Sequence, residues 1–396
     1  MRVILVLLIT VILMSAKSDK LSHIPPTKSI FLNINADTCN AKCMKEKLKN
    51  GKVFSFISHY NNSIDELDSM RSEFAYYERI FRISKDEELS IRVALLIPQK
   101  SIRRYASTTV NSVLAYLVSK QNSFEVKIFN TNDEKEESIL RELKNIKNEN
   151  FTYVIAPLTS KGATTIINNS SGLLVYMPTV HKKAFQASGS NILFGGIDYD
   201  EQIDVLLKHA NDRIAYFSDG STLSKSINNS LLEKNLEIIY SKSLSSSRVN
   251  FKDMLSENTV LNDSSIFLNT PLIKTSLISS QFRVYDIEPY VLLSTQINYN
   301  PMLLTLTQYD DRKKFYIANS IGKSTVELRE LNSLFEHDIV YDWVNYSTSI
   351  GIDYFYSNYF VPSTNRSFSE DIVKNQVQYD ISIMQPEENK FIKTLF

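Results

Sequence analysis

Between residues 91 and 198, short apolar runs alternate with segments that have the periodicity of amphipathic helices. Chains that alternate strand and helix in this way form a parallel sheet with helices on its faces. Three of the runs are almost continuously apolar, which is typical of strands buried on both sides. The predicted strands are residues 91–98, 124–129, 153–157 and 173–178.

The same pattern begins again after Asp198. Strands are predicted at residues 213–217, 236–240, 265–268 and 290–293, and helices at residues 223–234, 251–255 and 271–282. Two α/β sets of similar length predict a two-lobe α/β fold, with a cleft where ligands usually sit. We expect one lobe to comprise residues 90–198 and 301–396, with C-terminal segments that cross the hinge, and the other lobe to comprise residues 199–300.

Two later stretches alternate as strands do. Residues 338–346, which include Tyr341, Trp343 and Tyr346, are predicted to form a strand that builds core and hinge. Residues 376–384 are predicted to form a closing strand.

The N-terminus has the layout of a secretory signal peptide. Arg2 precedes an apolar run at residues 3–14, and Ser15-Ala16 supplies small residues before Lys17. We expect residues 1–16 to direct export to the periplasm and the mature chain to have no transmembrane segment. Cleavage and retention as an anchor both stay open, because Met14 is an indifferent residue at the −3 position.

Residues 17–89 are expected to form a polar tether and a small helical extension. Asp37 or Thr38 can cap its first helix, and a second helix is predicted from residue 63 to residue 81. Cys39 and Cys43 are four residues apart, so they share one helix face. Outside the cytosol a disulfide is the expected state, although two helical residues at this spacing would strain it. Free buried thiols and a redox or metal role are the alternatives.

Composition argues against several classes of function. The chain has 44 basic and 44 acidic residues, so it has no electrostatic footprint for nucleic acid. Gly322-Lys323-Ser324 resembles part of a phosphate-binding loop, but Ile317 stands where the motif needs its first glycine. The five histidines lack ligand spacing, and the acidic run at Glu134, Glu136 and Glu137 is interpreted as a solvated helix start. We therefore expect no enzymatic activity, cofactor or metal.

Several segments resemble the type I periplasmic binding proteins. The resemblance rests on residues 93–98 and 155–160, on the crossover 194–202, and on the pair 267–271 and 290–295. It covers roughly residues 90–390 and is strongest toward the amide- and amino-acid-binding group and the activators of penicillin-binding proteins. It implies a two-lobe protein that binds a solute or a protein.

One loop departs from that family. Solute binders tend to have small residues after the first strand, whereas this chain has Gln99-Lys100-Ser101-Ile102-Arg103-Arg104. Those cations would fill the cleft mouth, select an anion, or form a solvated loop. The loop at residues 160–164 keeps the small polar character that suits ligand binding at a helix N-terminus. The candidate cleft residues are Gln99, Ser101, Ser160, Lys161, Gly162, Thr179, Asp219, Ser294, Thr295 and Gln296.

The sequence therefore leaves two alternative functions. The first is a non-enzymatic cell-envelope scaffold for protein interaction or regulation, which the helical extension and the altered loop favour. The second is a solute-binding subunit that delivers an amino acid or similar molecule to an ABC transporter.

Overall fold

The computed structural model describes residues 39–60, 70–81, 91–120, 122–186, 189–246, 249–362 and 364–394. The expected signal peptide and most of the tether lie outside these ranges, as do Asp37 and Thr38. Among the described residues, no helix is both long and apolar enough to cross a membrane.

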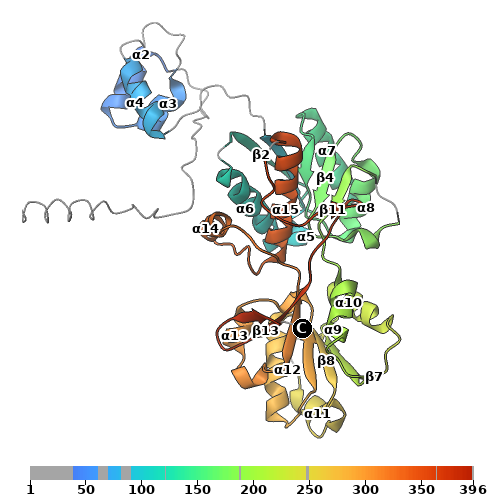
Figure 1. The fold of residues 1–396 in the computed structure, drawn as a ribbon. Helices are drawn as coiled ribbons and strands as arrows, with labels where there is room; N and C mark the ends of the chain where they lie inside the picture. The colour runs from blue at the N-terminus through green and yellow to red at the C-terminus, as the bar shows by residue number, and fades with distance from the viewer. Residues whose placement is uncertain are drawn as a thin grey trace, which may run out of the picture. The chain divides into compact units, whose positions relative to one another are not determined.

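Within its described residues, the helical extension contains the short helices α2 (Ala41–Lys49), α3 (Val53–His59) and α4 (Arg71–Phe81) (Figure 1). Their core is small and consists of Met44, Phe56, Ile57, Met70 and Phe74. We call the described residues 39–60 and 70–81 the helical module.

The disulfide between Cys39 and Cys43 is confirmed. Asn40 caps α2, because its side chain accepts a hydrogen bond from the backbone N–H of Cys43 at 3.1 Å. Cys39 therefore lies before the helix rather than within it. This removes the expected strain, and the two Cα atoms are 5.4 Å apart, inside the usual window.

The main α/β fold contains two seven-stranded sheets. The first has the order β11-β12-β5-β4-β3-β1-β2 and the second the order β14-β13-β10-β9-β8-β6-β7. The pairs from β1 through β3 and β4 to β5 are parallel, and so are those from β7 through β6, β8 and β9 to β10. The strands are β1 (Ile91–Ile97), β2 (Phe124–Asn130), β3 (Tyr153–Ile155), β4 (Leu174–Met177), β5 (Ile192–Phe194), β6 (Ile214–Ser218), β7 (Ile238–Ser243), β8 (Ser265–Asn269), β9 (Val291–Ser294), β10 (Phe315–Asn319), β11 (Ile372–Val373), β12 (Gln376–Val377), β13 (Ser382–Pro386) and β14 (Phe391–Lys393).

Helices cover the sheets as the apolar stripes predict. The α-helices of this part are α5 (Gln99–Ile102), α6 (Arg104–Ser119), α7 (Glu136–Asn148), α8 (Ser160–Asn169), α9 (Tyr199–Leu207), α10 (Thr222–Leu232), α11 (Phe251–Leu255), α12 (Leu272–Val284), α13 (Met302–Leu306), α14 (Val326–Leu334) and α15 (Trp343–Phe355). The short turns are η2 (Lys182–Ala184), η3 (Thr259–Leu261), η4 (Gln296–Asn298), η5 (Tyr309–Asp311) and the π-turn η6 (Tyr356–Phe360).

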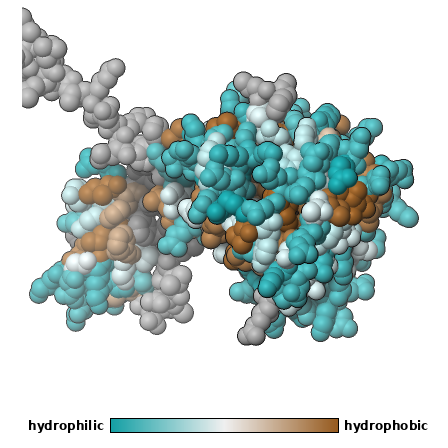
Figure 2. Space-filling view, turned by 90° about the horizontal axis from the view of Figure 1, so that it is seen from below, coloured by the Kyte–Doolittle hydropathy of each residue, from teal (hydrophilic) through white to brown (hydrophobic). Residues whose placement is uncertain are grey.

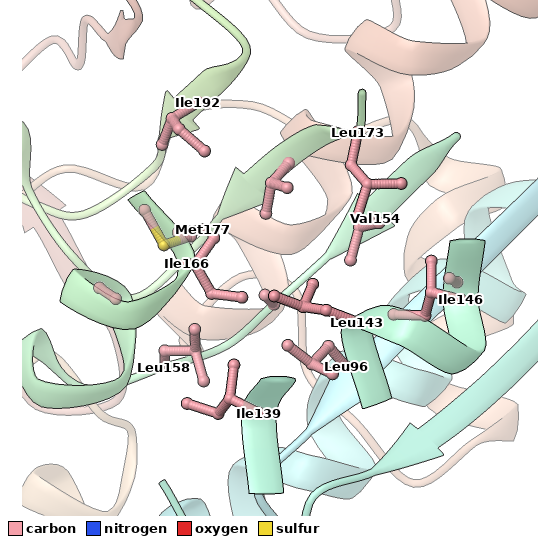
Figure 3. Close-up of a cluster of buried hydrophobic side chains, with 14 of the residues drawn as sticks. Leu96, Ile139, Leu143, Ile146, Val154, Leu158, Ile166, Leu173, Met177 and Ile192 are labelled. Carbon is pink, nitrogen blue, oxygen red and sulfur yellow. The ribbon is translucent and has the colours of Figure 1, made fainter. Parts of the chain in front are cut away.

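The core of the first lobe lies between its sheet and helices α7 and α8. Ile139, Leu143 and Ile146 of α7 pack with Leu96 and Val154 of the strands (Figure 3). Successive strand residues point to opposite faces. Tyr153, next to Val154, therefore meets α15 on the other face, with its ring 5.5 Å from that of Phe355.

The second lobe is built in the same way. Ile203 and Leu206 of α9 and Ile227 and Leu231 of α10 pack on one face of its sheet with Phe267. The other face carries α12, whose Phe282 ring lies 5.8 Å from that of Phe217 in β6.

The segments that connect the two sheets pass close to buried tyrosines. A Cβ atom on Gly195, just after β5, would lie 2.1 Å from the hydroxyl of Tyr176. A Cβ atom on Gly322, after β10, would lie 2.6 Å from the hydroxyl of Tyr346. The third connection runs from β12 to β13. In it, Tyr379 donates a hydrogen bond to the carbonyl of Gly195 at 2.6 Å. A side chain at position 195 or 322 would therefore clash with a buried tyrosine.

The C-terminal third differs from expectation in two respects. Residues 343–355 form helix α15 instead of a strand, because Asp342 caps it by accepting from the N–H groups of Val344 and Asn345. The expected closing strand at residues 376–384 is divided between β12 in the first sheet and β13 in the second.

The expected lobe division also needs correction within residues 301–396. Strands β10, β13 and β14 belong to the second sheet, where β10 pairs with β9 and β13. Only β11 and β12 from this part of the chain join the first sheet, because β12 pairs with β5.

The packing of α7 in the first lobe predicts that its buried and exposed side chains contribute unequally to stability. Ile146→Ala removes a fully buried side chain and should lower the free energy of unfolding by about 2–5 kcal/mol. Leu140→Ala, on the same helix but 36% exposed, should cost about 1 kcal/mol or less. Urea unfolding followed by circular dichroism measures both, and equal losses would contradict the assignment of α7's inner face.

Candidate functional site

A buried carboxylate lies at the carboxyl ends of the first sheet's strands. Glu134, in the loop between β2 and α7, is only 6% exposed. Its Oε1 accepts the backbone N–H of Thr159 at 2.8 Å, and its Oε2 accepts the Thr159 hydroxyl. Thr159 is the N-cap of α8, where the helix dipole stabilises negative charge. The N-terminus of α8 therefore already holds an anionic group from its own chain.

Gly162 makes room for this carboxylate. A Cβ atom on Gly162 would lie 3.0 Å from Cδ of Glu134 and 3.1 Å from Cδ2 of Leu158. Ser160 and Lys161, the neighbouring predicted ligand residues, are exposed. The predicted loop thus forms the first turn of α8, and its inner side packs against Glu134.

The other predicted residues of the first lobe also bond within that lobe. The hydroxyl of Thr179 donates to the carbonyl of Leu158 at 2.5 Å. Oε1 of Gln99 accepts from the side-chain amide of Asn130 at 3.0 Å. The expected loop at residues 99–104 is mostly helical, because residues 99–102 form α5. Gln99 and Ser101 are exposed on this helix. Arg103, with φ +49°, makes the turn between α5 and α6.

Three predicted residues of the second lobe are buried rather than open to a cleft. Ser294, Thr295 and Gln296 are 0%, 0% and 3% exposed at the end of β9. The Ser294 hydroxyl donates to the carbonyl of Leu268 at 3.0 Å and accepts from the amide of Asn298 at 2.8 Å.

Gln296 is held by a second glutamine. Its N–H donates to Oε1 of Gln202 at 2.9 Å, and its own Oε1 accepts the N–H of Ser320 at 2.6 Å. Nε2 of Gln202 closes the network by donating to the Ser320 hydroxyl at 2.7 Å. Two buried atoms here, Oγ1 of Thr295 and Nε2 of Gln296, have no hydrogen-bond partner among the described residues.

Asp219, the remaining predicted residue, organises a turn. Its Oδ1 accepts the N–H of Ser221 at 3.0 Å and the Ser221 hydroxyl at 2.6 Å. Ser221 in turn caps α10. The carboxylate is therefore engaged in starting the helix.

A small cavity lies where two connections meet. It has a volume of about 30 Å³ and is lined by His181, Asp198, Glu201, Ser320, Val377, Gln378, Tyr379 and Ile381. A space of this size accommodates water. Sites for small-molecule ligands usually have about 300–1,000 Å³, so this cavity is at most about a tenth of that size.

Three charged or titratable side chains lie close together beside this cavity. Lys183 contacts Asp198 at 2.5 Å, and Nε2 of His181 lies 3.9 Å from the same carboxylate. Burial favours the protonated form of Asp198, but the Lys183 hydrogen bond and His181 together hold the pKa of that carboxyl below its ordinary value. Burial also lowers the pKa of His181, against the attraction of Asp198.

Sequence reasoning missed the role of Glu134. The sequence pattern predicts a solvated helix start. Glu136 and Glu137 are exposed, as this interpretation requires, but Glu134 is buried. Its partner Thr159 is 25 residues away, so no local pattern links the two. The available signal was the helix N-terminus predicted at residues 160–164, because the first N–H groups of a helix need acceptors. Among the described residues, no group of three potential metal ligands is assembled.

The contact between Glu134 and Thr159 predicts a loss of stability. Glu134→Ala removes a buried carboxylate and both of its hydrogen bonds from Thr159, which should lower the free energy of unfolding by about 1–3 kcal/mol. Glu137→Ala is the matched control, because it removes an exposed acid from the first turn of α7. Chemical denaturation of both variants is the measurement, and equal effects would show that burial of Glu134 does not matter.

His181 predicts a pH dependence. Its pKa is lower in the folded chain than in the unfolded chain, so its contribution is present above the unfolded value of 6.5 and is lost as pH falls toward the folded pKa. His181→Gln should therefore reduce the loss of stability as the pH falls below 6.5. Urea midpoints across this window test the idea, and parallel curves for the two proteins would refute it.

Comparison with known proteins places the fold. No family model matches the sequence, and no curated protein matches it. Solved structures do match. The substrate-binding protein LivJ from Streptococcus pneumoniae, in complex with isoleucine, has a TM-score of 0.53 and 11% identity, covering 77% of this chain and 99% of LivJ. The leucine-binding protein LivK from Thermotoga maritima has a TM-score of 0.55 and 12% identity, with coverage of 77% and 98%.

A regulatory protein has a similar structure. The C-domain of LpoA from Haemophilus influenzae, a regulator of PBP1A, has a TM-score of 0.50 and 10% identity, covering 77% of this chain and all of that domain. These identities are low, so they inform on fold alone. The two mixed sheets with their flanking helices are the two-lobe fold of the type I periplasmic binding proteins.

Proposed function

We propose that this chain is an exported, non-enzymatic cell-envelope protein that uses its two-lobe scaffold to bind or regulate a protein partner. The observation that carries the proposal is the Glu134 carboxylate at the N-terminus of α8. A helix N-terminus at the carboxyl edge of a parallel sheet is where an anionic ligand group would bind. Here the chain supplies that group itself.

The second lobe supports the same function. Ser294 and Gln296, at the corresponding edge of its sheet, use their polar groups to join β9 to Leu268, Gln202 and Ser320. These contacts stabilise the lobe and leave few free polar groups for a solute.

Export is supported by two features. The sequence begins with a segment that resembles a signal peptide, and Cys39 and Cys43 are bonded, as is usual in oxidising compartments. The LpoA C-domain, described as a regulator of PBP1A, is a precedent for a regulatory role of this fold.

Solute binding is the second candidate. It is favoured by Ser160 and Lys161, which are exposed at the first turn of α8, and by the unpaired Oγ1 of Thr295 and Nε2 of Gln296. LivJ and LivK, which bind amino acids, share the fold. An amino acid or small anion would be the ligand.

Thermal unfolding in the presence of each amino acid and of small anions separates the two candidates. A solute at 100 times its dissociation constant would stabilise the folded chain by about 2.7 kcal/mol. We expect no shift, because the groups at both strand edges are largely engaged within the chain. A shift that Lys161→Ala abolishes and the control Lys147→Ala, at an exposed position on α7, preserves would instead establish solute binding.

The partner itself is tested by reciprocal capture. The tagged chain should retain one envelope protein, the tagged partner should retain this chain, and the purified pair should reassemble. A solute-binding protein of the same fold, carrying the same tag, is the control. Failure of the purified proteins to associate would contradict the scaffold function.

A further inference from the structure

One carboxylate joins the turn after β4 to the first helix of the second lobe. Oδ1 of Asp198 accepts the N–H groups of Asp200 at 3.1 Å and Glu201 at 3.3 Å, so Asp198 is the N-cap of α9. Its Oδ2 contacts the ammonium of Lys183 in η2 at 2.5 Å, and the Asp198 side chain is only 17% exposed. The ion pair therefore links a turn of the first lobe to the start of the second.

A histidine holds the same turn in place. Nδ1 of His181 accepts the backbone N–H of Lys183 at 3.2 Å and thereby caps η2. A neutral ring that accepts at Nδ1 carries its proton on Nε2, which lies 3.9 Å from the Asp198 carboxylate. The position of Lys183, and with it the ion pair, therefore depends on a histidine nitrogen that has no proton.

A second proton on the ring changes these contacts. Both nitrogens of a protonated imidazole are donors, so Nδ1 can no longer accept the N–H of Lys183. The positive ring also competes with the Lys183 ammonium for Asp198. Burial lowers the pKa of His181 in spite of the attraction of Asp198. Protonation is therefore unfavourable in this arrangement, and a falling pH favours an arrangement in which the turn has moved.

The surroundings of the ring leave this response to His181. Residues of all three connections line the cavity of about 30 Å³ beside it, which is large enough for water to reach the ring. Burial opposes ionisation of Asp198, but the Lys183 hydrogen bond and His181 hold its pKa below the ordinary value. Burial raises the pKa of Tyr379, so this phenol keeps its proton. The charged and titratable groups around the ring are Lys183 on η2, Asp198, Asp200 and Glu201 at the start of α9, and Tyr379 in the third connection.

We infer that His181, Lys183 and Asp198 form an acid-sensitive latch between the two lobes, closed while the imidazole is neutral and released when it takes up a proton. Release separates η2 from α9, so the connection after β5 can bend. The packing of the connections against Tyr176 and Tyr346 has no group that titrates in this way, so the chain stays folded. The inference applies whether the lobes bind a protein or a solute, because the latch lies at the connections.

Distances between the lobes test the inference in the full chain. Lys147→Cys on α7 and Lys252→Cys on α11 place one spin label in each lobe at exposed positions, while Cys39 and Cys43 stay bonded to each other. Double electron–electron resonance should give a shifted or broader distance distribution at about pH 5 than at about pH 7.5. The midpoint of this change should lie below pH 6.5. An unchanged distribution, or loss of the helical circular dichroism signal at the lower pH, overturns the inference.

Three variants assign the response to the latch. His181→Gln stays neutral and keeps an acceptor, so it should retain the neutral-pH distribution at the lower pH. Lys183→Met and Asp198→Asn each remove the ion pair and should give the acid distribution already at neutral pH, although Asn still caps a helix. A pH response that persists in His181→Gln contradicts the latch. So do ion-pair variants that match the parent at neutral pH.

Two controls separate the latch from other titrations and charges. His209→Gln removes a second histidine whose pKa burial lowers, but this ring lies 5.3 Å from that of Tyr316 in the second lobe. Hydrophilic residues cover much of the surface in Figure 2, so Lys225→Met, at an exposed position of α10, measures the loss of one surface charge. Both controls should behave as the parent chain does. Loss of the pH response in His209→Gln, or an acid distribution at neutral pH in Lys225→Met, overturns the inference.

Discussion

The close approach of the connecting segments to buried tyrosines is the constraint on which the two-lobe arrangement depends. Gly195 and Gly322 occur at two of the three connections, and a Cβ atom on either would overlap the hydroxyl of Tyr176 or Tyr346. Gly351 on α15 has the same relation to the ring of Tyr176, at 2.2 Å. Three of only nine glycines in the chain are therefore placed where helix α15 and the connections meet the first sheet. The tyrosine hydroxyls are not left unpaired, because Tyr176 donates to the carbonyl of Ser347 at 2.8 Å and Tyr346 donates to Glu370 at 2.5 Å. Close packing and the hydrogen bonds of these tyrosine hydroxyls together fix how the chain leaves each sheet.

Much of the fold follows from local pattern. The parallel strands are short apolar runs that end at proline or at small polar residues, as in residues 91–98 and 153–157, and helices α7 and α10 show one apolar face each. The pattern failed at two places in the C-terminal third of the chain. Residues 343–355 are helical because Asp342 caps them, although Tyr341, Trp343 and Tyr346 alternate as strand residues do. Residues 376–384 are divided between two sheets because β5 and β10 each offer an open edge to them. Neither edge is visible in the local sequence.

The candidate site was harder to predict than the fold. Polar residues after a strand are usually interpreted as facing solvent or ligand. Ser294 ends β9 and Thr179 follows β4, whereas Ser160 begins α8. What the sequence does not specify is the partner of each polar group. Glu134 reaches Thr159 across the loops that follow two different strands, and Gln202 reaches Gln296 from another helix. These contacts determine whether a strand edge is open or filled, and they are set by tertiary packing. A fold shared with amino-acid binders therefore does not by itself imply a solute site.

The order of strands has a consequence for biosynthesis. Both sheets take their last described strands from residues 372–393: β11 and β12 complete the β5 edge of one, and β13 and β14 complete the β10 edge of the other. Until those residues emerge, each nascent lobe exposes the hydrogen-bonding edge of a parallel sheet, which invites pairing with other chains. Long-range pairing of this kind also closes slowly. A polypeptide built in this way acquires its native sheet edges only after residues 372–393 have been synthesised.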